Sequence, residues 1–135
     1  MIAIPPRRTA RTCPNLVAHA RGADVLVHEA QSNALVHIME GAARDTGEAR
    51  VAKILGDIPS YHSDPADVAR EAVTAGVRLL LLTHFTPPPD NPVLTRIFRR
   101  DVDTVPPRGL VLGEDGTLVI LPTGSDAIDV TRLDP

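Results

Sequence analysis

Short apolar runs and amphipathic stripes alternate along this chain. The longest apolar run covers residues 77–82, is interrupted only by Arg78 and ends in Thr83-His84. Gly76 precedes the run and prolines occupy positions 87–89. A run this short with such borders is typical of a strand that is buried on both faces. Because α/β folds bind ligands just outside the carboxyl ends of their strands, the pattern places His84 at a candidate functional edge.

A second short run at residues 25–27 also predicts a buried strand, and it ends in His28-Glu29. The clearest helix begins at Asp64-Pro65, an N-cap followed by proline in the first turn, and ends at Gly76. Weaker helical stripes cover residues 14–20, 32–44 and 92–100. Residues 45–60 have the least readable pattern, with one helical turn at most. We interpret them as a mobile loop near a site or as a poorly ordered segment.

The last part of the chain has the pattern of a β-hairpin. Residues 110–112 and 117–121 are apolar and β-branched, and Asp115-Gly116 lies between them as a turn. The tail from Pro122 is polar and is expected to be peripheral. Taken together, the pattern predicts an α/β fold in which strands alternate with helices, closed by a terminal hairpin, with residues 1–135 forming a single domain.

Composition narrows the class of protein. The 135 residues are 43% apolar and 23% charged, which is typical of a globular chain. A net charge of −3 argues against a dedicated nucleic-acid surface, although RNA could still reach a local site, and 2% aromatic residues argue against a base-stacking platform. Cys13 is the single cysteine, so no intrachain disulfide or thiolate cluster forms. Without a membrane span or a signal peptide, we expect a cytoplasmic protein with no membrane partner.

Three histidines lie at the ends of expected elements, and a carboxylate accompanies them. His28 and His84 follow the two strands, His62 precedes a helix, and Glu29 adjoins His28. Imidazole and carboxylate groups that converge at strand ends can form a metal site or an acid/base pair. The alternative is that each histidine bonds to backbone or faces solvent, and for three histidines at corresponding ends the two interpretations stay open.

The strand-end segments, taken in order, resemble a known family. Residues 23–30 (Ala-Asp-Val-Leu-Val-His-Glu-Ala), 61–63 (Tyr-His-Ser) and 81–85 (Leu-Leu-Thr-His-Phe) are similar to the C-terminal half of metallo-β-lactamase-fold hydrolases. The branch in question contains ribonuclease Z, phosphodiesterases and arylsulfatase-like members. The resemblance covers about residues 7–125 and extends to the segments at 15–17, 22–24 and 113–117. It implies the C-terminal half of an αββα sandwich.

The resemblance also implies roles for individual residues. His84 would be a zinc ligand, and Glu29 and His62 would form a hydrogen-bonded pair near the scissile bond. His62 would protonate the leaving oxygen or hold the phosphoryl group. Zinc would lower the pKa of bound water to near 7, so that hydroxide attacks a phosphodiester or related ester at neutral pH. The expected substrate is a small-molecule or RNA phosphodiester, and the expected cofactor is zinc.

The chain departs from the family in its metal ligands. The main motif, His-x-His-x-Asp-His, is absent, because no two of the five histidines are two positions apart. Thr9 stands where the family places a metal-bridging aspartate. A catalytic zinc ordinarily needs three protein ligands, and His84 is only one. We therefore expect the chain to be inactive as a hydrolase unless an N-terminal half supplies the other ligands.

Half of a sandwich would leave a sheet face and a strand edge uncovered, so we expect a homo-oligomer or a complex with a complementing N-terminal half. Three interpretations of function follow. The first is a truncated zinc-dependent hydrolase, with Met1 an internal start in a longer reading frame. The second is a catalytically inactive remnant or structural module that keeps the half-fold. The third is an α/β domain that binds small molecules and is unrelated to this family.

Overall fold

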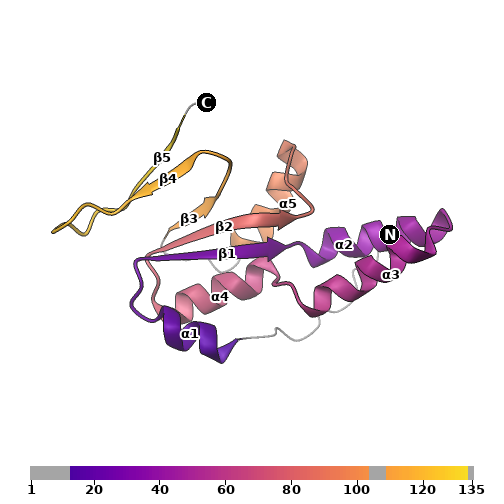
Figure 1. The fold of residues 1–135 in the computed structure, drawn as a ribbon, viewed down its shortest axis with the longest axis horizontal. Helices are drawn as coiled ribbons and strands as arrows, with labels where there is room; N and C mark the ends of the chain where they lie inside the picture. The colour runs from indigo at the N-terminus through magenta and orange to yellow at the C-terminus, as the bar shows by residue number, and fades with distance from the viewer. Residues whose placement is uncertain (1–12, 104–108, 134–135) are drawn as a thin grey trace.

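The computed structural model of this chain describes residues 13–103 and 109–133 (Figure 1). Helices and strands alternate through most of this part, so the chain is mixed α/β, as its pattern predicts. None of the helices described is long and apolar enough to cross a membrane. The elements, in order, are α1 (Pro14–Ala20), β1 (Val25–Gln31), α2 (Asn33–Asp45), α3 (Ala49–Asp57), the 3-10 turn η1 (Ile58–Ser60), α4 (Pro65–Ala75), β2 (Leu79–Thr86), α5 (Pro92–Asp103), β3 (Leu110–Leu112), β4 (Thr117–Ile120) and β5 (Asp129–Arg132).

The centre of the fold is a parallel sheet in the order β1-β2-β3, with helices packed on one face. Leu80 and Leu82 of β2 are completely buried and belong to one core with Phe98 and Val102 of α5. Helices α1 and α4 pack together, and α4 contacts both β1 and β2. They lie along the same side of β1 in Figure 1. Strand β2 is the middle strand, but β3 pairs with it only from Leu80 to Leu82, so beyond Leu82 the carboxyl end of β2 pairs with β1.

The other face of the sheet is less covered, which corrects one prediction. The strand at 77–82 was expected to be buried on both faces, but Leu81 is only half-buried and Thr83 is exposed. In β1, Val27 lies beside Leu81 in register and is 57% exposed. Side chains alternate across a strand, so Val27 and Leu81 share the face opposite the buried Leu80 and Leu82. On that face Leu79 is still buried, so the apolar run loses its second cover only from Leu81 onward.

Helix α4 begins and ends as its sequence predicts. The Asp64 side chain accepts a hydrogen bond from the Ala66 amide at 3.1 Å, and Pro65 is the first helical residue. Gly76 ends the helix in the left-handed conformation with a φ of 72°, which glycine adopts without steric cost. Strand β2 starts three residues later, so α4 delivers the chain directly to the centre of the sheet.

The prediction of a C-terminal hairpin is wrong, because its two expected strands pair with other strands and not with each other. Strand β3 pairs in parallel with β2, whereas β4 pairs antiparallel with β5, in a separate two-stranded sheet. Gly109 and Gly113 allow this approach to β2. A Cβ atom on Gly109 would lie 3.0 Å from the Arg78 carbonyl oxygen, and one on Gly113 would lie 3.1 Å from that of Leu82. The Asp115-Gly116 turn therefore joins two sheets, and the polar tail provides β5, whose four residues are all exposed.

Residues 45–60, which gave the weakest pattern, are mostly helical. Helices α2 and α3 with the turn η1 form a helical arm, residues 33–60, that extends beyond the carboxyl end of β1 in Figure 1. The prediction of a loop or a poorly ordered segment is wrong there, because α2 supplies an apolar face that α3 covers. The arm has its own small core, which contains Val36, Ala43, Ala52 and Leu55, with Ile58 packed against it.

Candidate functional site

The carboxyl ends of β1 and β2 lie at the same edge of the sheet because the two strands are parallel. Glu29 of β1 is beside Thr83 of β2 in the register, and both residues precede the point where their strand ends. His84 follows directly. The sequence prediction that His84 and Glu29 belong to one edge of the fold therefore agrees with the strand register.

Glu29 is held by two groups from the segment that follows the helical arm. The Ser63 amide donates to Glu29 Oε1 at 2.6 Å, and His62 Nδ1 lies 3.1 Å from Glu29 Oε2. The His62 and Glu29 side chains are 24% and 25% exposed, so the pair is shielded but reachable. The structure thus brings together two of the residues that the sequence singled out. A carboxylate beside an imidazole orients the ring and fixes which ring nitrogen faces away from it.

Local backbone contacts fix where His62 lies. Its amide donates to the Ile58 carbonyl at 3.2 Å, which continues the turn η1. One residue later, the Ser63 carbonyl accepts from the Gln31 amide at 2.8 Å, which ties the segment to the end of β1. Asp64 then caps α4. His62 is therefore positioned between the exit of the arm and the start of α4, and both anchors are made by the backbone.

His84 has an unusual backbone that its sequence does not reveal. Its φ is +46°, whereas residues other than glycine adopt positive φ only uncommonly. The register passes from Glu29 opposite Thr83 to Ala30 opposite Phe85, so His84 is the extra residue of a β-bulge. Bulges change the direction of a side chain and often lie next to functional sites. The His84 side chain is exposed at the same edge that carries Glu29.

His28 does not join this pair. Its Nδ1 atom contacts the backbone carbonyl of Glu29 at 2.8 Å. With Ser63 and His19, it lines a separate cleft of about 430 Å³ between α1 and α4. The buried Glu71 carboxylate of α4 also lines this cleft and accepts a hydrogen bond from the Cys13 amide. For His28, the backbone-bonding alternative from the sequence is the one the geometry supports.

The residues described do not by themselves fit a catalytic zinc. Among residues 13–103 and 109–133, no group of three or more histidine, cysteine, aspartate or glutamate side chains could hold a metal ion. His84 is one donor, and Glu29 and His62 bond to each other. Thr9, the residue at the expected position of the bridging aspartate, lies outside the described residues. A complete site would need ligands from elsewhere.

Tyr61 lies next to His62 at this edge, and its ring is neither buried nor part of the pair. Its side chain is 66% exposed, and its ring lies 5.2 Å from the ring of His62, tilted by 45°. It belongs to neither apolar core. A packing role is therefore not supported, and the exposed ring is part of the surface around His62. The signal available in the sequence was its position next to a candidate histidine.

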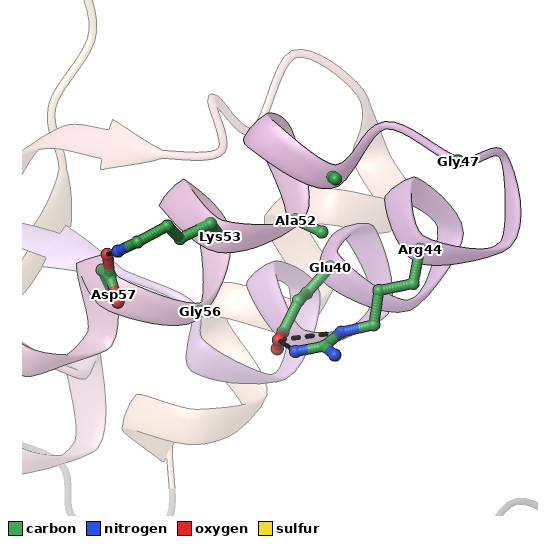
Figure 2. A pocket seen from close by; sticks show the side chains of 8 residues that line it. Glu40, Arg44, Gly47, Ala52, Lys53, Gly56 and Asp57 are labelled. Carbon is green, nitrogen blue, oxygen red and sulfur yellow. Dashed lines mark hydrogen bonds and ion pairs between the residues drawn. The ribbon is translucent and has the colours of Figure 1, made fainter.

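A second hollow lies within the helical arm and is distinct from this edge. It has a volume of about 540 Å³ and is lined by residues of α2, α3 and the loop between them (Figure 2). Arg44 bonds to Glu40, and Lys53 Nζ lies 2.5 Å from Asp57 Oδ2. The hydrogen bond from Arg44 lowers the pKa of the Glu40 carboxyl, and that from Lys53 to Asp57 raises the pKa of Lys53. Arg44 and Lys53, the two cations that line this groove, are thus each paired with a carboxylate of the same groove. The groove therefore has little to attract an anionic ligand.

No family model matches this chain. It is 43% identical over 87 residues to the ribonuclease Z of Pseudomonas putida KT2440, which covers 61% of this chain and 22% of that protein. It is 35% identical over 103 residues to the ribonuclease Z of Mycobacterium sp. strain KMS, which covers 76% of this chain and 32% of the relative. The ribonuclease Z of Pseudomonas putida F1 is 45% identical over 71 residues, or 53% of this chain and 17% of that protein.

The chain therefore spans less than a third of the length of these curated relatives. The matches agree with the family that the ordered motifs around Glu29, His62 and His84 resemble. At this level the expected relation is confirmed: over partial stretches, the chain is related to ribonuclease Z of the metallo-β-lactamase type.

Proposed function

We propose that this chain carries the proton-donating part of a phosphodiester hydrolase of the ribonuclease Z type. The observation that carries the proposal is the Glu29–His62 pair at the carboxyl edge of the sheet, with Nδ1 and Oε2 3.1 Å apart. Similarity to ribonuclease Z supports the reaction class. The substrate is a phosphodiester, in RNA or in a smaller molecule.

In this proposal His62 acts through the ring nitrogen that Glu29 does not contact. With Nδ1 bonded to Glu29, the protonated ring has Nε2–H free to donate to the oxygen that leaves phosphorus. The Ser63 amide holds the second carboxylate oxygen of Glu29 at 2.6 Å, which keeps the carboxylate from turning away. After the transfer, the ring keeps its Nδ1 proton on the side of Glu29. General acid catalysis of this kind contributes about 10²- to 10⁴-fold to a rate.

Zinc enters the proposal only through His84, the single donor that the described residues offer at this edge. The remaining ligands would have to come from outside those residues. We accordingly propose that the chain is the C-terminal half of an αββα sandwich that works as a homo-oligomer or with an N-terminal half. The short coverage of the relatives and the partly open sheet face at Val27 and Leu81 support this. Size-exclusion chromatography with light scattering tests this association. A stable monomer that does not bind an added N-terminal half would contradict it.

The activity test is hydrolysis of bis(p-nitrophenyl) phosphate. It uses the full chain alone and mixed with the N-terminal remainder of the Pseudomonas putida ribonuclease Z, each with and without zinc. We expect turnover in the mixture, and we expect His62→Ala to lower it about 10²- to 10⁴-fold. His37→Ala is the matched control, because His37 is a histidine of the arm with a 69% exposed side chain and should leave the rate unchanged. Equal rates in the two variants would contradict the role of His62.

A catalytically inactive structural module is the second candidate. The absence of a metal-binding cluster from the part of the chain that the structure describes favours it. This candidate predicts a folded, zinc-free protein that turns over no phosphodiester in any mixture. It also predicts that His62→Ala changes stability rather than activity, because the Glu29–His62 bond would then only join the arm to the sheet.

A further inference from the structure

Tyr61 has the features of a residue that contacts substrate rather than core. Two-thirds of its side chain is exposed, and its ring lies against the ring of His62 at 5.2 Å between centroids. A tyrosine can bury 150–250 Å² when it is covered, so leaving this ring in water forgoes a large favourable contribution. An exposed aromatic ring at the rim of an acid/base pair is a surface on which a planar group can rest.

The backbone holds this ring in place before any ligand arrives. The Tyr61 and His62 amides both donate to the Ile58 carbonyl at 3.2 Å, so the two residues extend one tight turn. Pro59 lies within the turn and fixes its own φ, which restricts the conformations of this segment. The Ser63 bonds to Glu29 and Gln31 then anchor the other side. A platform that is already positioned loses little conformational entropy when a ligand stacks on it.

Electrostatics gives a reason why stacking matters here. The chain has a net charge of −3, and Glu29 contributes a carboxylate to the edge itself. A phosphodiester therefore gains little from the net charge of the chain, so contacts that do not depend on charge matter for its affinity. Stacking on an aromatic ring is such a contact, because every planar aromatic group has a π-face.

We propose that Tyr61 is a specificity-determining residue that selects phosphodiesters with a planar aromatic group next to the leaving oxygen. The inference rests on the proposed function, because it takes His62 as the group that faces this oxygen. The aromatic group stacks on the Tyr61 ring and thereby places the leaving oxygen near the His62 ring. A nucleobase and an aryl ester share this chemistry, whereas a dialkyl phosphodiester lacks it. Tyr61 acts through its ring rather than its hydroxyl.

The chain offers a direct probe, because Tyr61 is its single tyrosine and it has no tryptophan. The Tyr61 ring signals in an aromatic carbon–proton NMR spectrum are therefore assigned without ambiguity. We expect adenylyl-adenosine and bis(p-nitrophenyl) phosphate to move these signals upfield in a saturable way. Diethyl phosphate, which carries no ring, should leave them in place. The signals of Phe98, which is completely buried, serve as the internal control.

Two variants separate the ring from the hydroxyl. Tyr61→Leu should weaken binding of adenylyl-adenosine, followed by calorimetry, about 5- to 150-fold, which is the range for one stacked base. Tyr61→Phe should keep the affinity within about twofold of the unmodified chain, because the ring remains. Val93→Ala, on an exposed residue of α5, is the matched control and should change nothing. Affinity lost equally in Tyr61→Phe and Tyr61→Leu would overturn the stacking role, as would equal binding of diethyl phosphate and adenylyl-adenosine.

The binding readout also separates this inference from the proposed function. Ring-dependent shifts at Tyr61 without turnover in any mixture would support the platform while contradicting the hydrolase. The opposite result is turnover that is lost in the His62 variant but is the same in Tyr61→Leu as in the unmodified chain, for both aryl and dialkyl substrates. That result would support the hydrolase and overturn the stacking role of Tyr61.

Discussion

The sheet with its helices and the helical arm differ in how completely they bury their apolar residues. In the sheet core, Leu80, Leu82, Phe98 and Val102 are completely buried. In the arm, Leu55 is 9% exposed and the small core contains two alanines. The arm also exposes large apolar side chains at Ile38, Met39, Val51 and Ile54. Local stability follows buried apolar contact, so we expect the arm to open more readily than the sheet.

The comparison matters because the candidate pair spans the boundary between the two regions. Glu29 belongs to β1 and is held by the sheet, whereas His62 follows the turn that ends the arm. The Nδ1–Oε2 contact between them joins residues 33 positions apart in sequence. Opening of the arm would therefore move His62 and leave Glu29 in place. The site depends on its weaker region, and the following substitutions test that dependence.

The largest effect is expected in the sheet. Leu82→Ala removes a completely buried side chain from the core and should lower the global free energy of unfolding by about 2–5 kcal/mol. Urea denaturation followed by circular dichroism measures it. A loss below about 1 kcal/mol would mean that the sheet core collapses around the cavity, and it would weaken the contrast with the arm.

A smaller and more local effect is expected in the arm. Leu55→Ala should cost about 2 kcal/mol, and the loss should be confined to α2, α3 and η1. Amide hydrogen exchange should show faster exchange in residues 33–60 and unchanged protection in β2. Ile54→Ala is the control, because Ile54 is 50% exposed and its loss should stay within about 0.5 kcal/mol. Uniform loss of protection in both regions would show that they unfold as one unit.

At the bulge, a substitution should stabilise the protein. His84→Gly places glycine at a φ of +46° and should raise the free energy of unfolding by about 1 kcal/mol, because the left-handed region penalises a Cβ atom. Gly76→Ala is the reciprocal control at a φ of +72°, where the same argument predicts a loss of about 1 kcal/mol. Thermal denaturation measures both. Destabilisation by His84→Gly would mean that the His84 side chain makes contacts that outweigh the backbone cost.

The smallest effect concerns the Glu40–Arg44 pair of the arm. The Arg44 hydrogen bond lowers the pKa of Glu40 in the folded chain below its ordinary value of 4.5. A lowered folded pKa contributes stability above the unfolded pKa, and this contribution is lost as the pH falls through the folded value. Helicity of the arm should therefore fall on acidification from about pH 5 to about pH 3 more in the unmodified chain than in Glu40→Gln. Identical profiles would show that the exposed pair contributes nothing measurable.

The sequence by itself determined the features that depend on near neighbours. Asp64, Pro65 and Gly76 set both ends of α4, because capping and the left-handed turn use only local backbone groups. The apolar run at residues 79–82 gave β2, and the ordered strand-end motifs indicated the relation to ribonuclease Z. The resemblance to that family also implied that Glu29 and His62 form a hydrogen-bonded pair, and their side chains are in contact. Their catalytic roles stay a proposal.

Only the tertiary structure decided the features that depend on distant partners. Strand β3 pairs with β2 rather than β4 because Gly109 and Gly113 let the two backbones meet, and the hairpin pattern of the sequence contains no information about β2. The bulge at His84 arises from the register between two strands. The open sheet face at Val27 follows from where the helices pack, since an apolar run looks the same whether one or both of its faces are covered. Spacing along a chain fixes local geometry, whereas pairing, register and exposure are decided by segments that meet only after folding.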